Sequence, residues 1–504
     1  MESNNENNIF LPDINCFYSI EIAEHLIKLG FNINLIGIRK NNKDKIYKKK
    51  IKELIENSKS KIIIQEDFFY PSDNFQESNK KEFSWVSLKS FSKISYYEKL
   101  FILSLDRNSF FPISNLKGIR LFYNIFSYFH KELTSNKINS IIFFGTPHGY
   151  YSIVLWSVAE FLGIKIIYTE GSGISPMLST IENTLDLKRN YAGKFAELGI
   201  LSNDNHKEVE KIVTQESTAD YYIRNNSTLN INKLFIKKII ALSTKHFYLK
   251  YQSQELFLLK KPIRGYKYIV PLIKYYFSII KAERFLSSIS VDRIPRKKNK
   301  KILTLFLHQQ PEATTMPLAG IFADQLLAFN MISEALPSDY QILIKEHPNF
   351  YSDGGEERHE RSIEFFSYML KDKRVSFIKK SINSQYLINE SNYIVSIAGT
   401  VGWQALNVGK PCIVFGNSWF SQCKSCFVVD SVDELKKAFK NISFLKKVDV
   451  EKDVNEFLDN YSKRLIYAPP NQQCFLDGSD LMGSFKLNTA LKNISNAIKI
   501  SLTS

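Results

Sequence analysis

A strand–helix–strand pattern between residues 341 and 416 limits most narrowly what this chain can fold into. Three short apolar runs, at residues 341–345, 393–397 and 412–415, have the length and β-branched content of buried parallel strands. A helical pattern at 401–408 separates the last two runs. Thr400 is placed to cap its first turn, and Gly409 to end it in the left-handed conformation. The pattern therefore predicts a parallel α/β sheet.

Polar residues follow two of these expected strands. Glu346, His347 and Pro348 come after the first run, and residues 396–400 follow the second and open a helix. Ligands of such sheets lie beyond the carboxyl ends of the strands, and a helix N-terminus favours an anion. We expect a nucleotide-phosphate pocket here. The sequence leaves open that His347 is a core histidine bonded to backbone and that residues 396–400 merely start a helix.

The N-terminal part of the chain shows the same alternation and predicts a doubly wound sheet. Strands are expected at residues 9–14, 31–38, 62–65, 140–144 and 164–169, and helices at 18–29, 40–60 and 151–162. His148 and Glu170 follow the last two strands, so we expect both to face one crevice.

A further strand at 302–307 opens the C-terminal half and is followed by His308, Gln310 and Glu312. Helices are expected at 322–336, 432–439, 453–465 and 486–502, one of the last two packing back on the first domain. The predicted organisation is a first Rossmann-like domain (1–200), a helical basic connector (201–300), a second Rossmann-like domain (301–470) and a closing helix (471–504).

With 504 residues, the chain is long enough for two hydrophobic cores. Its formal net charge of +16 is compatible with nucleic acid, an anionic membrane or anionic substrates. No nucleic-acid-binding motif is present, so no nucleic-acid partner is expected. Basic and aromatic residues interleave at 233–301, which indicates either peripheral contact with an anionic membrane or a basic helical connector.

No apolar run is long enough to span a bilayer, and the N-terminus lacks the features of a signal peptide. We expect a cytoplasmic location, at the inner face of the membrane if the basic aromatic stretch contacts lipid. The five cysteines, an odd number, do not suggest a disulfide framework. Cys423 and Cys426 form a CxxC, but no second pair of zinc ligands lies nearby, so no metal is expected.

Several strings resemble known glycosyltransferases. His347-Pro348 followed by the small-residue turn at 396–400 resembles the HP and Ser/Thr-rich motifs of bacterial sialyltransferases. The strings LHQQPEATT, KEHP and SIAGTVGWQALNVGKPCIVFG, together with Glu170-Gly171, are more similar to capsule polysaccharide biosynthesis proteins, which include Kdo transferases. The resemblance covers roughly 140–173 and 302–430. Gly399-Thr400 replaces the paired serines of the sialyltransferases, and Thr169 replaces one acidic residue before Glu170.

The resemblance implies a GT-B fold, a CMP-activated ulosonic acid donor such as Kdo or a sialic-type acid, and a surface glycan acceptor. No cofactor is implied beyond the donor. The nucleotide-sugar site is then expected to comprise Lys345, His347, Pro348, Ser396, Gly399, Thr400 and Gln404. A general base must activate the acceptor hydroxyl, and Glu170 is the first candidate, followed by Glu312 and His308. His148 and Gln310 are expected to line the acceptor side of the cleft.

Two further residue expectations concern neighbours of this site. Glu346 is expected to pair with Lys345 or Arg358 without a chemical role, and Asp324 and Gln325 to be solvated or capping groups. Two other functions remain open: a UDP-sugar-dependent GT-B enzyme, and a non-catalytic partner in capsule assembly or export. A metal-dependent GT-A enzyme is disfavoured because no DxD triplet follows a suitable strand.

Overall fold

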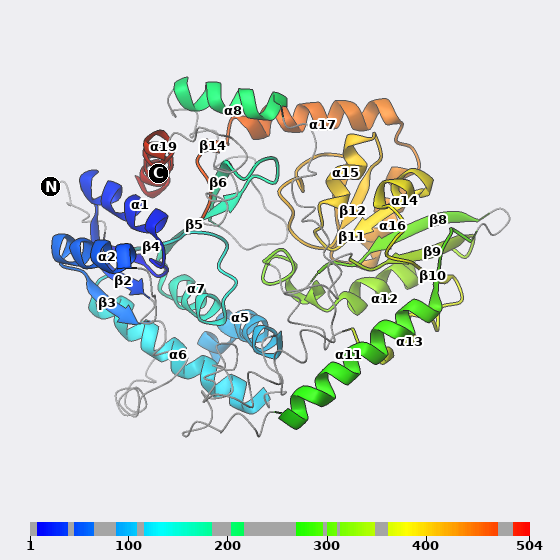
Figure 1. Cartoon of the computed structure of the whole chain (residues 1–504), viewed down its shortest axis with the longest axis horizontal. Coiled ribbons are helices and arrows are strands. Elements are labelled where there is room, and N and C mark those ends of the chain that lie inside the picture. The colour runs from blue at the N-terminus through cyan, green and yellow to red at the C-terminus, as the bar shows by residue number, and fades with distance from the viewer. Residues whose placement is uncertain are drawn as a thin grey trace.

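The computed structural model places two α/β lobes side by side (Figure 1). It describes residues 8–38, 45–64, 87–107, 115–183, 203–215, 269–295, 300–309, 313–347, 361–471 and 487–503. The predicted arrangement is confirmed: each lobe has a seven-stranded, largely parallel sheet with helices on both faces, as in a GT-B fold of two Rossmann-like domains.

The first lobe is built on five parallel strands in the order β5-β4-β1-β2-β3. They are β1 (Asn8–Leu11), β2 (Asn32–Ile38), β3 (Lys61–Ile64), β4 (Ser140–Phe143) and β5 (Lys165–Gly171). One face carries α1 (Phe17–Lys28) and α2 (Lys45–Ser58), and the other carries α5 (Leu88–Arg107), α6 (Asn115–Ser135) and α7 (Tyr150–Leu162). The order is that of a doubly wound sheet, whose strand order reverses between β1 and β4.

Two antiparallel strands extend this sheet beyond β5. They are β6 (Leu178–Glu182) and β14 (Ile466–Tyr467), and β14 comes from the far end of the chain. The helix that follows, α19 (Leu487–Thr503), packs on α1. The chain thus returns to the first lobe, as expected for one closing helix. The return begins before the expected boundary at residue 470, since β14 already belongs to the first sheet.

The second lobe has the strand order β10-β9-β8-β11-β12-β13, with the short β7 (Ser290–Val291) added beside β10. Its strands are β8 (Lys301–Phe306), β9 (Tyr340–Lys345), β10 (Val375–Ile378), β11 (Tyr393–Ser396), β12 (Cys412–Val414) and β13 (Cys426–Val428). All pairs in this sheet are parallel. Numbered from β8, the order is the 3-2-1-4-5-6 of a dinucleotide-binding fold, with its reversal between β8 and β11.

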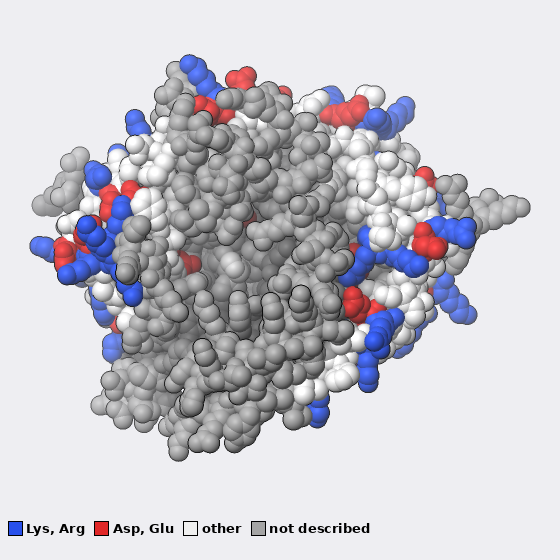
Figure 2. All heavy atoms as spheres, in the orientation of Figure 1, with Lys and Arg blue, Asp and Glu red and all other residues white. Residues whose placement is uncertain are grey.

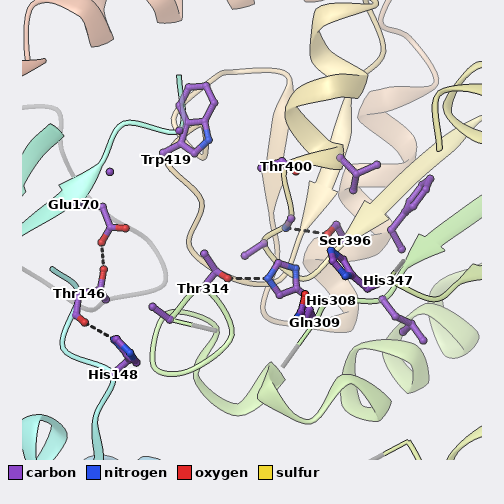
Figure 3. A pocket seen from close by; sticks show the side chains of 18 of the residues that line it. Thr146, His148, Glu170, His308, Gln309, Thr314, His347, Ser396, Thr400 and Trp419 are labelled. Atoms are coloured by element: carbon purple, nitrogen blue, oxygen red, sulfur yellow. Dashed lines mark hydrogen bonds between the residues drawn. The ribbon is translucent and has the colours of Figure 1, made fainter. Parts of the chain in front are cut away.

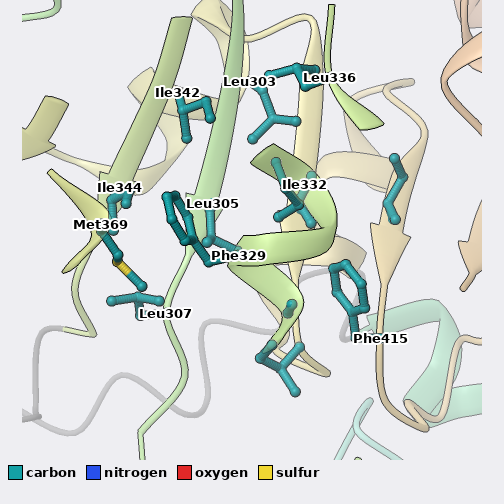
Figure 4. Close-up of a cluster of buried hydrophobic side chains, with 14 of the residues drawn as sticks. Leu303, Leu305, Leu307, Phe329, Ile332, Leu336, Ile342, Ile344, Met369 and Phe415 are labelled. Atoms are coloured by element: carbon teal, nitrogen blue, oxygen red, sulfur yellow. The ribbon is translucent and has the colours of Figure 1, made fainter. Parts of the chain in front are cut away.

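Helices cover both faces of the second sheet, so its strands are apolar on both sides. One core contains Leu303, Leu305 and Leu307, which point from β8 and its end toward the same helices (Figure 4). Ile302 and Phe306 belong to the core on the opposite face. The first core packs against α11 (Ile269–Ile289), α12 (Gln325–Ala335), α13 (Ile363–Met369) and α16 (Val432–Ile442). The second core includes residues of α8 (Asn203–Gln215), α14 (Ser384–Glu390), α15 (Val401–Asn407) and α17 (Lys447–Ser462).

The expected helical connector at 201–300 is described only for α8 and for residues 269–295 and 300. α8 contacts both α17 and β14, and α11 packs against α13. Most of the basic aromatic stretch at 233–301 therefore lies outside the described residues. Among the helices that the structure describes, none combines the length and apolar character needed to cross a membrane.

Candidate active site

A cleft of about 1250 Å³ lies between the lobes, and residues of both lobes line it. Its walls include the carboxyl ends of the strands on either side of the two reversals in strand order: β1 and β4 in the first lobe, β8 and β11 in the second. The carboxyl ends of β5, β9 and β10 also contribute. Ligands of doubly wound sheets bind at such points. Figure 3 shows the two groups of side chains facing each other, with Glu170, Thr146 and His148 opposite His308, His347 and Ser396.

His308 lies two residues after the end of β8 and is held through its backbone. The side chain of Gln325 accepts from the His308 N–H (2.8 Å) and donates to its carbonyl oxygen (3.0 Å). The imidazole Nε2 is hydrogen-bonded to Thr314 Oγ1 at 2.7 Å (Figure 3). Gln325 is buried, so the expectation that it is a solvated or capping group is wrong; Asp324 does cap α12, by accepting from Leu326 N.

His347 lies at the end of the neighbouring strand β9 and is half-buried in the cleft wall. Its ring centroid is 6.4 Å from that of His308, with the rings tilted by 54°. Its backbone N–H donates to Glu346 Oε1 at 2.9 Å. The two imidazoles therefore stand together on the second-lobe wall. Pro348 lies outside the described residues.

The turn after β11 brings a backbone segment close to these rings. Ser396 Oγ accepts from Gly399 N at 3.0 Å. A Cβ on Gly399 would lie 3.2 Å from His308 Nδ1 and 2.9 Å from Ser396 Oγ, so glycine permits the close approach. Thr400 starts α15, but its side chain makes no capping bond, and that expectation is wrong. Its backbone is already in the helical region (φ −57°, ψ −18°), whereas a capping residue is extended.

Lys345 is the last residue of β9, and its ammonium is bonded to backbone. Its ammonium donates to the carbonyl oxygens of Lys379 (2.8 Å) and Lys380 (2.6 Å), which holds the loop after β10. Burial, together with the charge of Lys380, lowers the pKa of Lys345 to about 8, while Glu346 acts in the opposite direction. Lys345 borders the cleft, as does Gln404, which is half-buried on α15.

Glu346 pairs with Arg361 (2.8 Å), which corrects the expected pairing with Lys345 or Arg358. Arg361 starts the described segment that leads into α13, and its proximity to β9 is set by tertiary packing. Arg358 lies outside the described residues.

The first-lobe wall carries Glu170, Thr146 and His148. Glu170 accepts a hydrogen bond from Thr146 Oγ1, and His148 Nδ1 lies 2.8 Å from Thr146 O (Figure 3). His148 is exposed and Glu170 half-buried. Glu170 lies within β5 instead of after it, because β6 pairs antiparallel there and opposes Glu170 with Thr180. Gln310 and Glu312 lie outside the described residues.

A known protein family matches the part of the chain that forms most of the second lobe. Residues 207–423 match the model of the family described as capsule polysaccharide biosynthesis protein. The resemblance to this family is confirmed over that segment. The segment contains His308, His347 and the turn at 396–400, whereas Glu170, Thr146 and His148 precede it.

Solved structures give weaker likenesses. The β-Kdo 2,4-transferase KpsC of Thermosulfurimonas dismutans is 17% identical, with 33% of this chain and 55% of that chain covered and a TM-score of 0.23. The β-Kdo 2,7-transferase KpsC of the same organism is 13% identical over 60% and 73%, with a TM-score of 0.26. The UDP-GlcNAc 2-epimerase of Methanocaldococcus jannaschii is 12% identical over 90% and 99%, with a TM-score of 0.24.

This chain thus spans about half of the 2,4-transferase. With TM-scores this low, nothing about the function of this chain follows from these structures. The fold assignment rests on the strand orders of this chain. A comparison with curated proteins finds no match.

Several cleft residues were missed by the sequence analysis. Asp13 follows β1 at the first-lobe reversal, and Trp419 reaches the cleft from the segment after β12. An acidic residue at the end of a first strand indicates a cleft position, but the expected strand at 9–14 includes Asp13, whereas β1 ends at Leu11. Trp419, the loop 380–385 and Asn471 carry no such local signal.

The cysteines after β12 are buried. Burial raises the pKa of Cys423 to about 12, and the pKa of Cys426 is raised by its contact with Cys412 and by burial. Thiols with raised pKa values stay protonated at neutral pH and are poor nucleophiles and metal ligands.

Proposed function

We propose that this chain is a GT-B glycosyltransferase that moves an ulosonic acid, Kdo or a sialic-type acid, from a CMP-sugar to a capsule or lipopolysaccharide glycan. The observation that carries the proposal is the opening of both strand-order reversals onto one cleft, with imidazoles on one wall and a carboxylate on the other. The family match over the second lobe supports a role in capsule polysaccharide biosynthesis.

On the donor side, the leaving group is CMP, whose phosphate gains charge as the glycosidic bond breaks. Preorganised hydrogen-bond donors stabilise such charge best. His308 and His347 provide ring N–H groups, and Ser396 a hydroxyl, from three adjacent strand ends. The backbone at Gly399 lies close to His308 and Ser396 and forms part of this wall.

On the acceptor side, Glu170 serves as general base. It takes the proton from the acceptor hydroxyl while that oxygen bonds to the anomeric carbon and the bond from that carbon to CMP breaks. The hydrogen bond from Thr146 Oγ1 holds one of the two carboxylate oxygens in place. Asp13, which follows β1, is a second carboxylate among the described residues that line this wall.

The decisive experiment is a thermal-shift screen of the full chain against CMP, UDP and GDP. A ligand at about 100 times its dissociation constant adds about 2.7 kcal/mol of stability, which such a screen detects. Stabilisation by CMP alone supports the proposal, and stabilisation by UDP alone favours a UDP-sugar enzyme. Donor hydrolysis with CMP-sugars and UDP-sugars, measured with and without EDTA, then tests both the donor class and the proposed independence from divalent metals.

A non-catalytic role in capsule assembly or export makes a different prediction. Replacement of Glu170 or His347 by alanine would then leave glycan production in cells unchanged. Loss of glycan with normal protein levels would instead support transfer by this chain.

We also propose peripheral contact with anionic membranes through the outward face of α11. Lys274, Phe277, Lys281 and Arg284 are exposed and recur at helical spacing, while Ile279 faces the core. Basic side chains follow the position of α11 at the lower right of Figure 2. Each cation contributes about 1 kcal/mol of attraction near an anionic bilayer.

The test is flotation of the full chain with phosphatidylserine-containing vesicles. Loss of two cations in Lys274→Glu/Lys281→Glu should cost at least about 2 kcal/mol, a roughly 30-fold fall in partitioning. The control Lys436→Glu/Lys437→Glu makes the same charge change on exposed positions of α16. Equal flotation of the two variants would favour the connector role.

A further inference from the structure

A buried pair of opposite charges lies directly behind the two cleft histidines. The Arg361 side chain is 0% exposed and that of Glu346 1%, and Arg361 Nε donates to Glu346 Oε2 at 2.8 Å. The guanidinium also lies over the Phe365 ring, with Cζ 4.5 Å from the ring centroid. Glu346 and Phe365 together therefore fix the position and the plane of the guanidinium.

The pair is bonded to the backbone of both histidines. Arg361 Nη2 donates to the carbonyl oxygen of His308 at 3.1 Å, and Glu346 Oε1 accepts from His347 N at 2.9 Å. One salt bridge thus joins the ends of β8 and β9 at the points from which the imidazoles project. Gln325 fixes His308 from a third direction.

Stability alone gives no reason for such a pair. Buried ion pairs can often be replaced by apolar residues of similar volume without loss of stability, because desolvation offsets their attraction. An apolar pair could not make directional hydrogen bonds to two neighbouring strand ends. That directional role distinguishes Arg361 and Glu346 from ordinary core residues.

We propose that Arg361 and Glu346 are positioning residues that hold the His308 and His347 rings in a fixed mutual arrangement toward the cleft. The rings stand 6.4 Å apart at a 54° tilt, and both line the second-lobe wall. The consequence for CMP binding rests on the proposed function, whereas the orientation of the rings does not.

The test variant is Arg361→Lys, which keeps the positive charge. Lysine offers a point charge instead of a planar fork, so it cannot bond Glu346 and His308 O in the same geometry. The readout is the NMR signals of ¹³Cε1-labelled histidine in the full chain, which has eight histidines. His308→Gln and His347→Gln assign the two signals of interest.

We expect both signals to shift in Arg361→Lys and CMP affinity, measured by calorimetry, to fall about tenfold to 100-fold. A misplacement of about 1 Å can slow a reaction by about 100-fold, and this value sets the upper end of the expected loss of affinity. The matched control is Arg374→Lys in the same lobe. Arg374 pairs with Asp372 (2.7 Å) and donates to Leu336 O (2.6 Å), and neither Arg374 nor Asp372 lines the cleft. This control should change thermal stability and leave the two histidine signals in place.

Unchanged histidine signals in folded Arg361→Lys would overturn the proposal, as would a change confined to thermal stability. If the signals move but wild-type protein does not bind CMP, the positioning role stands and the proposed donor class fails. If Arg361→Lys does not fold, Glu346→Gln/Arg361→Gln removes both charges together and takes its place. Wild-type histidine signals in that double variant would refute the positioning role.

Discussion

Replacement of Gly173 by alanine should destabilise the protein at a contact between the two lobes. Gly173 lies between β5 and β6 in the first lobe, with a φ of +72°. A Cβ at this position would fall 2.0 Å from Trp419 Nε1 and 2.3 Å from its Cδ1, in the second lobe. Trp419 cannot move away easily, because it packs on Trp403 and Tyr461 at centroid distances of 4.5 and 5.5 Å.

Two costs add at this position. A non-glycine residue in the left-handed region costs about 1–2 kcal/mol. Overpacking a close contact costs about a further 1–3 kcal/mol. The hydrogen bond from the Tyr461 hydroxyl to Ser172 O (3.0 Å) lies beside the clash and would be strained with it. We therefore expect a total loss of about 2–5 kcal/mol.

The chain supplies a matched control. Gly163, after α7, has a φ of +71°, and a Cβ added there would have no atom within 4 Å, so Gly163→Ala carries the backbone cost alone. Urea unfolding of both variants measures the difference, which isolates the contact between the lobes. Trp419→Ala should cost less stability in the Gly173→Ala background than in wild type, since substitutions at contacting sites are non-additive. Equal losses in the two glycine variants would refute the reasoning.

Three further predictions address the cleft. His347→Ala should weaken CMP binding by severalfold or more in calorimetry, and unchanged affinity would contradict the assigned phosphate pocket. Glu170→Gln should leave donor binding intact and slow transfer by about 10²- to 10⁴-fold; near wild-type turnover would move the base elsewhere, with Asp13→Asn as the next variant to assay. Lys345→Met should remove a pH-dependent contribution to stability. Because burial lowers the folded-state pKa of Lys345 to about 8 from an ordinary 10.5, the unfolded chain binds more protons between these values. The free energy of unfolding of wild type should therefore rise with pH relative to the variant, by at most about 1.4 kcal/mol per pH unit. If urea unfolding gives both proteins the same pH dependence of this free energy across the range, the lowered pKa of Lys345 is disproved.

The alternation of strands and helices was predictable because its signals are local. The apolar runs at 140–144, 302–307, 341–345 and 393–397 all became strands whose bounds differ by a residue or so. Gly163 and Gly409 adopt the left-handed conformation at the ends of their helices. Placement of His308, His347 and residues 396–400 on one wall follows from strand ends alone.

Tertiary contacts account for what the sequence did not reveal. The two-residue strand β14 exists only because β6 is there to pair with it, and Arg361 meets Glu346 across 15 positions of sequence. Thr400 has the residue type of a cap, but its backbone is already helical, and the side chain that bonds the turn is that of Ser396. These contacts depend on how the elements pack, which residue type and spacing along the sequence do not indicate.

The return of the chain to the first lobe has a consequence for synthesis. Ile466, Leu491, Ile494 and Ile498 share one core with β1 and α1, so that face stays uncovered until these late residues arrive. On the ribosome, the second lobe has all its strands by residue 428, well before that. The first lobe is therefore synthesised first but completes its core last. Nascent chains should expose the apolar flank of α1 to chaperones until the last residues are added.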